Sequence, residues 1–292
     1  MTKQAKNLIL ISSFAAFFIF SGLIVFYAYG YQFDFKNLKL VKTGGILIRA
    51  NTDGAEVFID GQFEGKTSFL TGTFAKKNLL PGDYEIEVKK EGLPALKKSV
   101  EVKSGEVSQL VHLYLAGKKE LLEFVENPEP AEEVKEYFIS KIDGLLYRRF
   151  EKEKVEKVSS ESVYIKDYKL KVLQANIYLA SRDADAPGVF SLLSSGSWEQ
   201  IYQLPSNDLV LSPDNKKLAI VGPNEITVLW LKDENEPPYF KKGHEELVLK
   251  IGEKIKEALW FETGWHLVYT TELGETKFIE LDPTGGRVDV KI

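Results

Sequence analysis

The sequence predicts an all-β protein carried on one N-terminal transmembrane helix, and three observations lead to that prediction. The first is an uncharged apolar run near the N-terminus. The second is a series of short strands in which apolar and polar residues alternate between turns that contain Gly or Pro. The third is an imperfect repeat, with a spacing of 49 residues, in the C-terminal half. Each observation defines one part of the chain.

Composition supports folded domains and limits the available chemistry. The 292 residues are 44% hydrophobic and 12% aromatic, which is enough to build cores. The net charge of −5 argues against a nucleic-acid-binding protein, because such proteins usually present a basic face. The chain has no cysteine, which excludes disulfides, thiolate metal sites and cysteine nucleophiles. The three histidines are His112, His244 and His266.

Residues 8–29 are the predicted membrane segment. They form 22 residues without a charge, and a helix that rises about 1.5 Å per residue needs about 20 residues to cross a hydrocarbon core of about 30 Å. Tyr27 and Tyr29 lie at the far end, where aromatic rings favour the membrane interface. A cleaved signal peptide is the alternative, with Ala28 and Gly30 as small residues at the cleavage site. The apolar region of a signal peptide is usually only about 7–15 residues long, so we expect an uncleaved anchor.

We therefore predict that residues 1–30 form a cytoplasmic tail and a single-pass anchor in the cell membrane. Lysines on both sides of the apolar run leave the orientation undecided by charge. An N-terminal signal-anchor normally exports the chain on its C-terminal side, and we expect the C-terminal domains to be extracytoplasmic. Residues 31–43, which mix aromatics and lysines, are a predicted juxtamembrane stalk.

Residues 44–115 predict a small antiparallel β-sandwich. The runs GILIRA and AEVFID read as strands, and Asp60-Gly61 is a two-residue hairpin turn that the aspartate can close with its own side chain. Pro81-Gly82 is a turn before residues 84–89, which alternate apolar and charged side chains. Two further strands flank Ser104-Gly105. The glycines for which we expect a backbone unfavourable to other residues are Gly54, Gly61, Gly65 and Gly82.

The same stretch carries a family resemblance in its turn and strand residues. They are Gly54-Ala55, Val57, Ile59-Asp60-Gly61, Gly65, Thr67, Leu80-Pro81-Gly82, Tyr84 and Val88. This pattern resembles the PEGA domain. The segment that names the family reads Thr52-Asp53-Gly54-Ala55 here, and Ser68 and Leu93 also depart from the pattern, all of them in turns. The resemblance implies a small β-sandwich of surface-exposed or membrane-attached proteins, without a catalytic role.

Residues 116–136 are a predicted acidic linker. A short helix at KKELLEFVE opens it, and Pro128 and Pro130 then lie among four glutamates. Prolines and like charges so close together disfavour a packed element and favour a semi-rigid, self-repelling spacer.

Residues 137–292 are again rich in predicted strands. A hairpin surrounds Asp143-Gly144, and residues 209–231 are repeated at 259–281, with Leu218 aligned to Leu267. A weaker copy precedes them, and each copy reads as three strands joined by turns. Repeats of this length with several strands each are typical of propeller blades.

The run LSPDNKKLAIV also resembles the Ser-Pro-Asp-Gly turn of bacterial β-propellers related to WD repeats, with Asn215 in the glycine position. Asparagine tolerates the left-handed backbone that such a turn needs. The region is short for a closed ring, so we predict a small or incomplete β-propeller. Three arrangements remain possible for this region: short blades, a ring closed by residues 137–141 beside the last strand, or an open stack of sheets.

No set of catalytic or metal-binding residues emerges, and we predict no enzyme and no cofactor. His244 with Glu245 and Glu246 reads as a solvated loop, because neighbouring strand residues point to opposite faces. Asp183 and Asp185 hint at a calcium loop, but Pro187 stands at the next ligand position, so a hairpin tip is favoured. Trp265 lies in the turn ETGWH and is the one candidate for an exposed contact residue.

These observations predict a non-catalytic, membrane-anchored envelope protein that acts as an interaction or structural module outside the membrane. Binding of cell-wall polysaccharide through exposed aromatics is the alternative. The expected partners are the membrane, through residues 8–29, and an envelope protein or a cell-wall glycan. The site residues of the sandwich are expected to be structural: Gly54, Ala55, Asp60, Gly61, Gly65, Thr67, Pro81 and Gly82.

Overall fold

A computed structural model describes residues 3–35, 37–126, 136–150 and 154–292. The chain divides into two compact units. Unit 1 comprises Met1–Gly117 and Thr284–Gly286, and unit 2 comprises Lys118–Pro283 and Arg287–Ile292. Strands account for 47% of the residues and helices for 11%, which confirms the predicted mostly-β fold. The two prolines of the predicted linker, Pro128 and Pro130, lie outside the described residues.

Unit 1 begins with helix α1 (Lys3–Ala28), which confirms the predicted N-terminal apolar helix. Its segment Leu10–Ala28 has a mean hydropathy of 2.2, and none of that window is buried within the chain. Its length and composition suit either a membrane anchor or a signal sequence.

The predicted stalk folds back on itself as a hairpin. Strand β1 (Tyr31–Asp34) pairs with β2 (Lys39–Lys42), and this two-stranded sheet is hydrogen-bonded to no other sheet among the described strands. The Gly30 carbonyl accepts hydrogen bonds from both the backbone nitrogen and the hydroxyl of Thr43, each at 2.7 Å. The two ends of the hairpin, at Gly30 and Thr43, are therefore held together.

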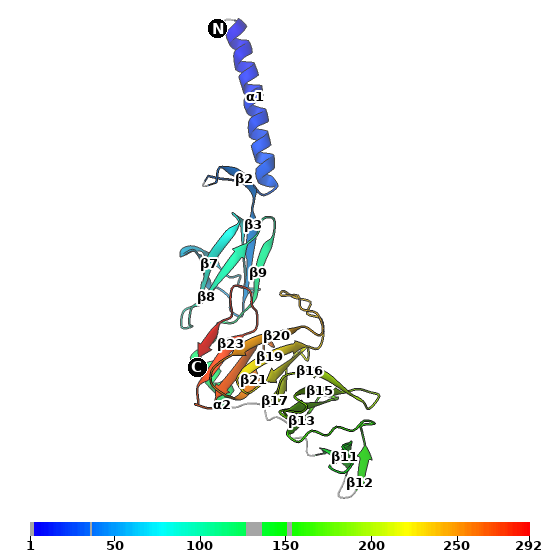
Figure 1. Cartoon of the computed structure of the whole chain (residues 1–292). Coiled ribbons are helices and arrows are strands. Elements are labelled where there is room, and N and C mark those ends of the chain that lie inside the picture. The colour runs from blue at the N-terminus through cyan, green and yellow to red at the C-terminus, as the bar shows by residue number, and fades with distance from the viewer. Residues whose placement is uncertain (1–2, 36, 127–135, 151–153) are drawn as a thin grey trace. The chain divides into compact units, whose positions relative to one another are not determined.

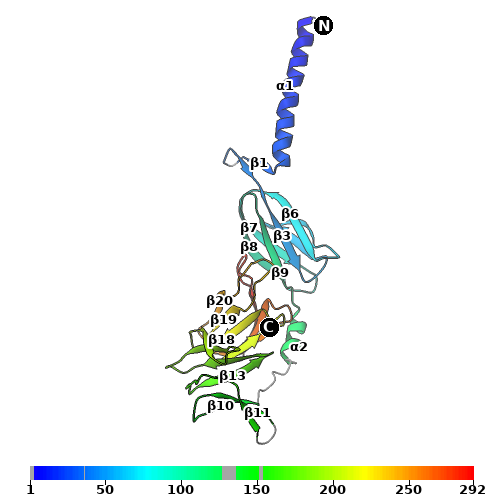
Figure 2. The ribbon, with the colours of Figure 1, turned by 90° about the vertical axis from the view of Figure 1, so that its right-hand side faces the viewer.

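The rest of unit 1 is built from two sheets around one core (Figure 2). Their strand orders are β6-β3-β9 and β5-β4-β7-β8, and β3 pairs antiparallel with β6 but parallel with β9. Strand β8 buries every second side chain from Leu96 to Val102, as expected for a sheet with one face on a core. The strands are β3 (Gly44–Ala50), β4 (Glu56–Ile59), β5 (Gln62–Lys66), β6 (Thr73–Leu79), β7 (Gly82–Lys89), β8 (Leu96–Val102) and β9 (Val107–Leu113).

Unit 2 opens with the predicted short helix, α2 (Lys118–Glu126). Four antiparallel sheets follow, each made of strands consecutive in the chain, and their colours pass from green to red in Figure 1. The first two contain β10 (Tyr137–Ile139), β11 (Leu146–Phe150) and β12 (Lys154–Lys157), then β13 (Tyr168–Leu173), β14 (Asn176–Ser181), β15 (Gly188–Leu192) and β16 (Trp198–Tyr202). The last two contain β17 (Asp208–Leu211), β18 (Lys217–Val221), β19 (Glu225–Trp230), β20 (Glu245–Lys250), β21 (Ile255–Trp260), β22 (His266–Thr271), β23 (Thr276–Glu280) and β24 (Asp289–Lys291).

The sequence repeat corresponds to the last two of these sheets. Leu218 and Leu267 occupy equivalent second strands, and both side chains are fully buried. Among the described strands, β10 pairs only with β11 and β24 only with β23. The suggested closure by residues 137–141 beside the last strand is therefore not formed between the described strands: β10 and β24 are edge strands of separate sheets.

Neighbouring sheets of unit 2 share apolar cores. One cluster joins β17–β20 to β21–β24 through side chains such as Trp230, Trp260 and Tyr269. A second joins β13–β16 to β17–β20 through Tyr178, Ile220 and others. Burial of apolar side chains between sheets thus links the last three sheets of unit 2.

Candidate functional site

The turn at Asp60-Gly61 connects β4 to β5 in the second sheet of unit 1. The φ angles of 49° and 76° place both residues in the left-handed region, which confirms the predicted two-residue hairpin. The sequence suggested that the Asp60 carboxylate closes its own turn, and this is wrong. It accepts a hydrogen bond from the backbone nitrogen of Glu85 at 2.9 Å, because β7 runs beside the turn.

Thr67 ties together two loops that are far apart in sequence. Its hydroxyl accepts a hydrogen bond from the Ala55 nitrogen at 2.9 Å and donates one to the Thr52 carbonyl at 3.1 Å. Backbone bonds from Gly54 to Thr67 and from Thr67 to Ala55 complete the connection. Thr67 and Ala55 are buried, so these bonds satisfy groups that water does not reach.

The remaining motif residues shape the backbone. A side chain at Gly65 would approach the Phe74 ring to 2.9 Å, so this position needs a residue without a Cβ. At Pro81-Gly82 the chain turns with a φ of 157° at the glycine, and the Tyr84 hydroxyl closes the turn by donating to the Leu80 carbonyl at 2.8 Å. The contacts of these residues are therefore structural.

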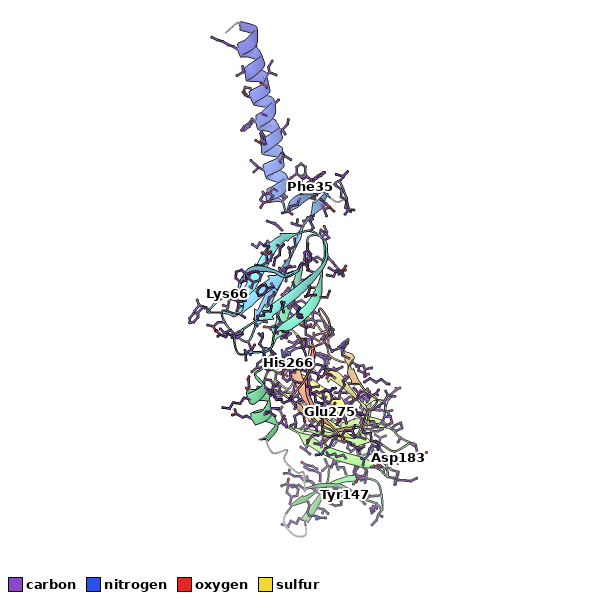
Figure 3. The ribbon with its side chains drawn as sticks, turned by 90° about the vertical axis from the view of Figure 1, so that its left-hand side faces the viewer. Phe35, Lys66, Tyr147, Asp183, His266 and Glu275 are labelled. Atoms are coloured by element: carbon purple, nitrogen blue, oxygen red, sulfur yellow. The ribbon has the colours of Figure 1, made fainter. Side chains whose placement is uncertain are left out.

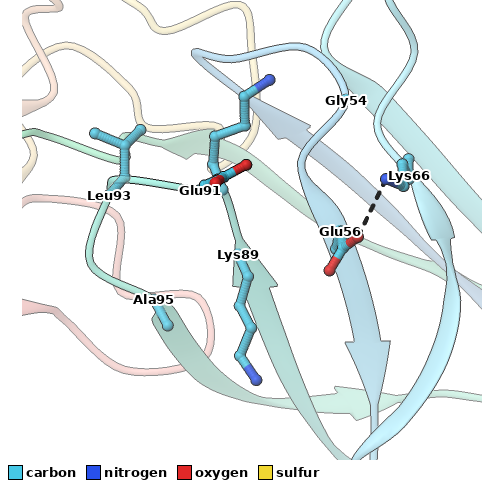
Figure 4. A pocket seen from close by; sticks show the side chains of 8 residues that line it. Gly54, Glu56, Lys66, Lys89, Glu91, Leu93 and Ala95 are labelled. Atoms are coloured by element: carbon cyan, nitrogen blue, oxygen red, sulfur yellow. Dashed lines mark ion pairs between the residues drawn. The ribbon is translucent and has the colours of Figure 1, made fainter.

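A cleft of about 590 Å³ opens beside this framework, where the loop after β7 faces β4 and β5 (Figure 4). Its walls carry the three ammonium groups of Lys66, Lys89 and Lys90. Lys66 pairs with Glu56 at 3.1 Å, and Lys90 donates to the Asp53 carbonyl at 2.6 Å. No sequence pattern identified this cleft. The neighbouring lysines Lys89 and Lys90 mark one wall in the sequence, but they could not show that Lys66 lies across from them.

The outer face of the four-stranded sheet continues from the cleft. Phe58 and Phe63 pair edge to face at 5.6 Å, and the Lys89 ammonium lies 4.6 Å from the Phe58 ring. The hydrogen bond from Lys89 holds the pKa of Glu87 below its ordinary value. Phe63 is 56% exposed. An exposed aromatic residue bordered by paired charges is typical of a surface that contacts another protein.

Residues 43–114 match the family model of the PEGA domain. That match confirms the predicted resemblance and shifts its bounds by one residue at each end. The cleft and the outer face described above therefore belong to the PEGA domain, while unit 2 lies beyond the matched residues. No curated protein shows significant sequence similarity to the chain.

The expectation that Trp265 is exposed is wrong. Its side chain is only 6% exposed and belongs to the core between the last two sheets of unit 2. The residue does lie in the turn between β21 and β22, but its ring folds inward against the Lys217 ammonium at 4.6 Å. Trp230 and Trp260 are also buried, and Trp198 is half-buried. The tryptophans of unit 2 thus serve packing.

The Ser-Pro-Asp turn is the base of a buried ionic cluster. Lys217, which is fully buried, donates to the Asp214 carboxylate at 2.9 Å and lies 3.4 Å from the Glu234 carboxylate. Lys216 donates to the other Glu234 oxygen at 2.9 Å. Asn215 adopts a φ of 57°, which confirms the left-handed backbone expected at this position. We define Asp214, Lys216, Lys217 and Glu234 as the ionic cluster.

Burial alone would raise the pKa of both carboxyls in the ionic cluster. For Asp214, hydrogen bonds from Ser212 and Lys217 outweigh that effect and hold the pKa below its ordinary value. For Glu234, the hydrogen bond from Lys216 and the charge of Lys217 do the same. Both groups are therefore held as carboxylates, and they offer no proton for acid catalysis at neutral pH.

The other polar candidates also have structural partners. His244 lies in the loop before β20 with its side chain 35% exposed; its ring stacks on Phe240 at 4.3 Å, and its Nε2 lies 3.1 Å from Glu246. Asp183 accepts hydrogen bonds from the nitrogens of Lys166 and Asp185, which confirms the hairpin tip between β14 and β15. Within the described ranges, no three His, Asp or Glu residues gather as metal ligands would.

Figure 3 places the labelled side chains of unit 2 on separate elements. Tyr147 lies on β11, Asp183 after β14, His266 on β22 and Glu275 before β23. The Tyr147 hydroxyl donates to Asp143 within its own hairpin, and His266 bonds Thr263 in its own turn. Tyr147 and His266 thus stabilise the turns beside them, whereas the Glu275 carboxylate pairs with Lys291 on β24.

Proposed function

We propose that the chain is a non-catalytic, membrane-anchored protein of the cell envelope, with both β units outside the cytoplasm and a protein as the partner. The observation that carries the proposal is the order of its parts. An apolar helix that is exposed along its span is followed, after the short β1–β2 hairpin, by a PEGA domain, which is consistent with a non-catalytic extracellular module. Residues 8–29 would cross the membrane once.

The contact surface that we propose is the outer face of the PEGA domain, with Phe58, Phe63 and Lys89 at its centre. Phe63 and Lys89 are available to a partner, while the Lys–Glu pairs around them supply polar contacts at the rim. Glycan binding loses its main support, because the tryptophan on which it depended is buried.

For unit 2 we propose a small, incomplete propeller that serves as a second docking module. Four consecutive meander sheets, of which the last three share apolar cores with their neighbours, support this architecture. The first sheet has three strands and the other three have four each among the described residues.

Topology can be tested with single cysteines, because the chain has none of its own. Lys6, Leu70 and Leu273 are exposed positions in the tail, the PEGA domain and unit 2. A membrane-impermeant maleimide should label Leu70→Cys and Leu273→Cys on intact cells and Lys6→Cys only after permeabilisation. The reverse pattern would place both units in the cytoplasm and overturn the proposal.

Partner contact can be tested with a photoreactive amino acid in place of Phe63. Ala75, exposed on β6 of the other sheet, is the matched control. We expect a discrete protein adduct from position 63 on irradiated cells and none from position 75. Equal adducts at the two positions, or none at either, would argue against the outer face as a contact surface.

A further inference from the structure

We infer that the β1–β2 hairpin is a membrane-surface element, whose apolar face lies in the interfacial layer of the lipid bilayer. The inference rests on the proposed membrane anchor and adds a second lipid contact to it. It concerns residues 31–42, which connect α1 to the PEGA domain.

The hairpin has one apolar face. Phe33 lies directly opposite Leu40 in the ladder, and side chains two residues apart in a strand share a face. Tyr31 and Lys42, which are opposite each other at the base of the hairpin, therefore lie on the Phe33 side. Gln32 opposite Val41 and Asp34 opposite Lys39 belong to the other, more polar side.

The apolar residues have no cover within the described part of the chain. Phe35 is 83% exposed, Leu38 76%, Leu40 48% and Phe33 46%. Phe33 and Phe35 contact each other edge to face at 5.0 Å. An isolated two-stranded hairpin is marginally stable in water, so an exposed apolar face of this kind calls for a surface to rest on.

The place of the hairpin in the chain, directly after α1, indicates that this surface is the membrane. Helix α1 ends at Ala28 and β1 begins at Tyr31, and Phe26 in the last turn contacts Tyr31 edge to face at 5.9 Å. The bonds between Thr43 and Gly30 hold the base of the hairpin at the same point. The hairpin thus begins where a spanning helix would leave the hydrocarbon core, and Figure 3 labels Phe35 on it.

Polar groups of the hairpin suit the same location. The Asp34 carboxylate accepts two hydrogen bonds from Asn37, at 3.1 and 2.7 Å. Lys39 on the polar side and Lys42 at the base of the hairpin are exposed residues, and both can extend toward anionic lipid headgroups while the aromatic rings enter the interface.

The test uses the full chain in vesicles that contain anionic lipid. Nitroxide labels on Phe35→Cys and Leu38→Cys report depth through relative collision rates with oxygen and a water-soluble nickel chelate. We expect both labels about 5–10 Å below the headgroup boundary, the depth of interfacial elements. Lys39→Cys, on the polar face, is the matched control and should remain in water. Ile19→Cys reports the centre of α1.

The outcomes separate the two proposals. A deep label at position 19 with water-exposed labels at 35 and 38 would overturn the hairpin inference, leave the anchor intact and indicate a protein as the cover. A water-exposed label at position 19 would overturn the anchor, and the hairpin inference with it.

Hydroxyl-radical footprinting of the unsubstituted chain tests the same inference without nitroxide labels, which could themselves insert into the bilayer. Phe35 and Phe69 are matched phenylalanines, 83% and 81% exposed, in the hairpin and in the loop after β5. Hydroxyl radicals should oxidise Phe69 in vesicles and spare Phe35. Equal oxidation of the two residues would contradict the inference.

Discussion

At the scale of single residues, this protein uses side-chain hydrogen bonds to backbone groups to join separate segments, at the exposed Asp60 and at the buried Thr67. Asp60 bonds Glu85, and Thr67 bonds Ala55 and Thr52. A buried donor left without its partner costs more than an average hydrogen bond contributes, so Thr67, which accepts from the buried Ala55 nitrogen, tolerates little change.

Replacing Thr67 by alanine is expected to destabilise the PEGA domain by about 1–3 kcal/mol, because the Ala55 nitrogen loses its buried acceptor. Thr67→Ser keeps the hydroxyl and is the control. Hydrogen exchange of β4 and β5 amides measures the free energy of opening locally. Equal losses in the two variants would show that the methyl group, rather than the hydrogen bonds, matters.

Within the ionic cluster, Lys217→Met should destabilise unit 2 by about 3 kcal/mol, since Asp214 loses its ion-pair partner and Glu234 loses one of its two. Lys216→Met is the control: its side chain is 31% exposed, and a loss of about 1 kcal/mol or less is expected. Urea unfolding followed by tryptophan fluorescence measures both, because all four tryptophans lie in unit 2. Similar losses would contradict the assigned role of Lys217.

Unit 2 should also lose stability in acid. The pKa values of Asp214 and Glu234 are lower in the fold than the values of about 3.9 and 4.3 in an unfolded chain. Their contribution is therefore complete above those unfolded values and is lost as pH falls through the lower folded ones. The tryptophan-monitored urea midpoint, measured from pH 6 to pH 3, should fall less steeply in Glu234→Gln than in the unsubstituted chain.

At the scale of elements, α2 illustrates how a short helix is held by its apolar side. Leu121 is 3% exposed, and Phe124 contacts Phe261 edge to face at 5.1 Å. A helix of nine residues has little stability in water, so this packing maintains it.

Leu121→Ala should destabilise unit 2 by about 2–3 kcal/mol through the cavity it leaves. Leu122→Ala is the matched control, because that neighbour is 40% exposed, and it should change stability by about 0.5 kcal/mol or less. Tryptophan-monitored urea unfolding again provides the measurement. If both variants lose the same free energy of unfolding, α2 does not pack on the sheets of unit 2 in solution.

At the scale of the whole molecule, the role of α1 decides how the protein is attached. An uncleaved anchor retains the tail, whereas a signal sequence is removed. With one epitope tag before residue 1 and another after residue 292, we expect one membrane-bound band near 33 kDa that carries both tags. A mature band that carries only the C-terminal tag would show cleavage and overturn the anchor.

Several features of the molecule were predictable from sequence because they depend on neighbours in the chain. The apolar helix, the Asp60-Gly61 turn, the left-handed Asn215 and the repeat that relates Leu218 to Leu267 all arise from local pattern. Period-two alternation likewise revealed the strands of the PEGA domain, since a half-buried strand must alternate.

Other features depended on contacts between distant residues, and only the tertiary structure decided them. Trp265 lies in a turn, yet its ring is buried in the core and contacts the ammonium of Lys217, 48 residues earlier. The cleft needs Lys66 opposite Lys89 and Lys90, and the predicted stalk became a hairpin because Thr43 bonds back to Gly30. Local sequence determines which conformation a segment favours, whereas burial and partnership depend on which surface the folded chain brings against it.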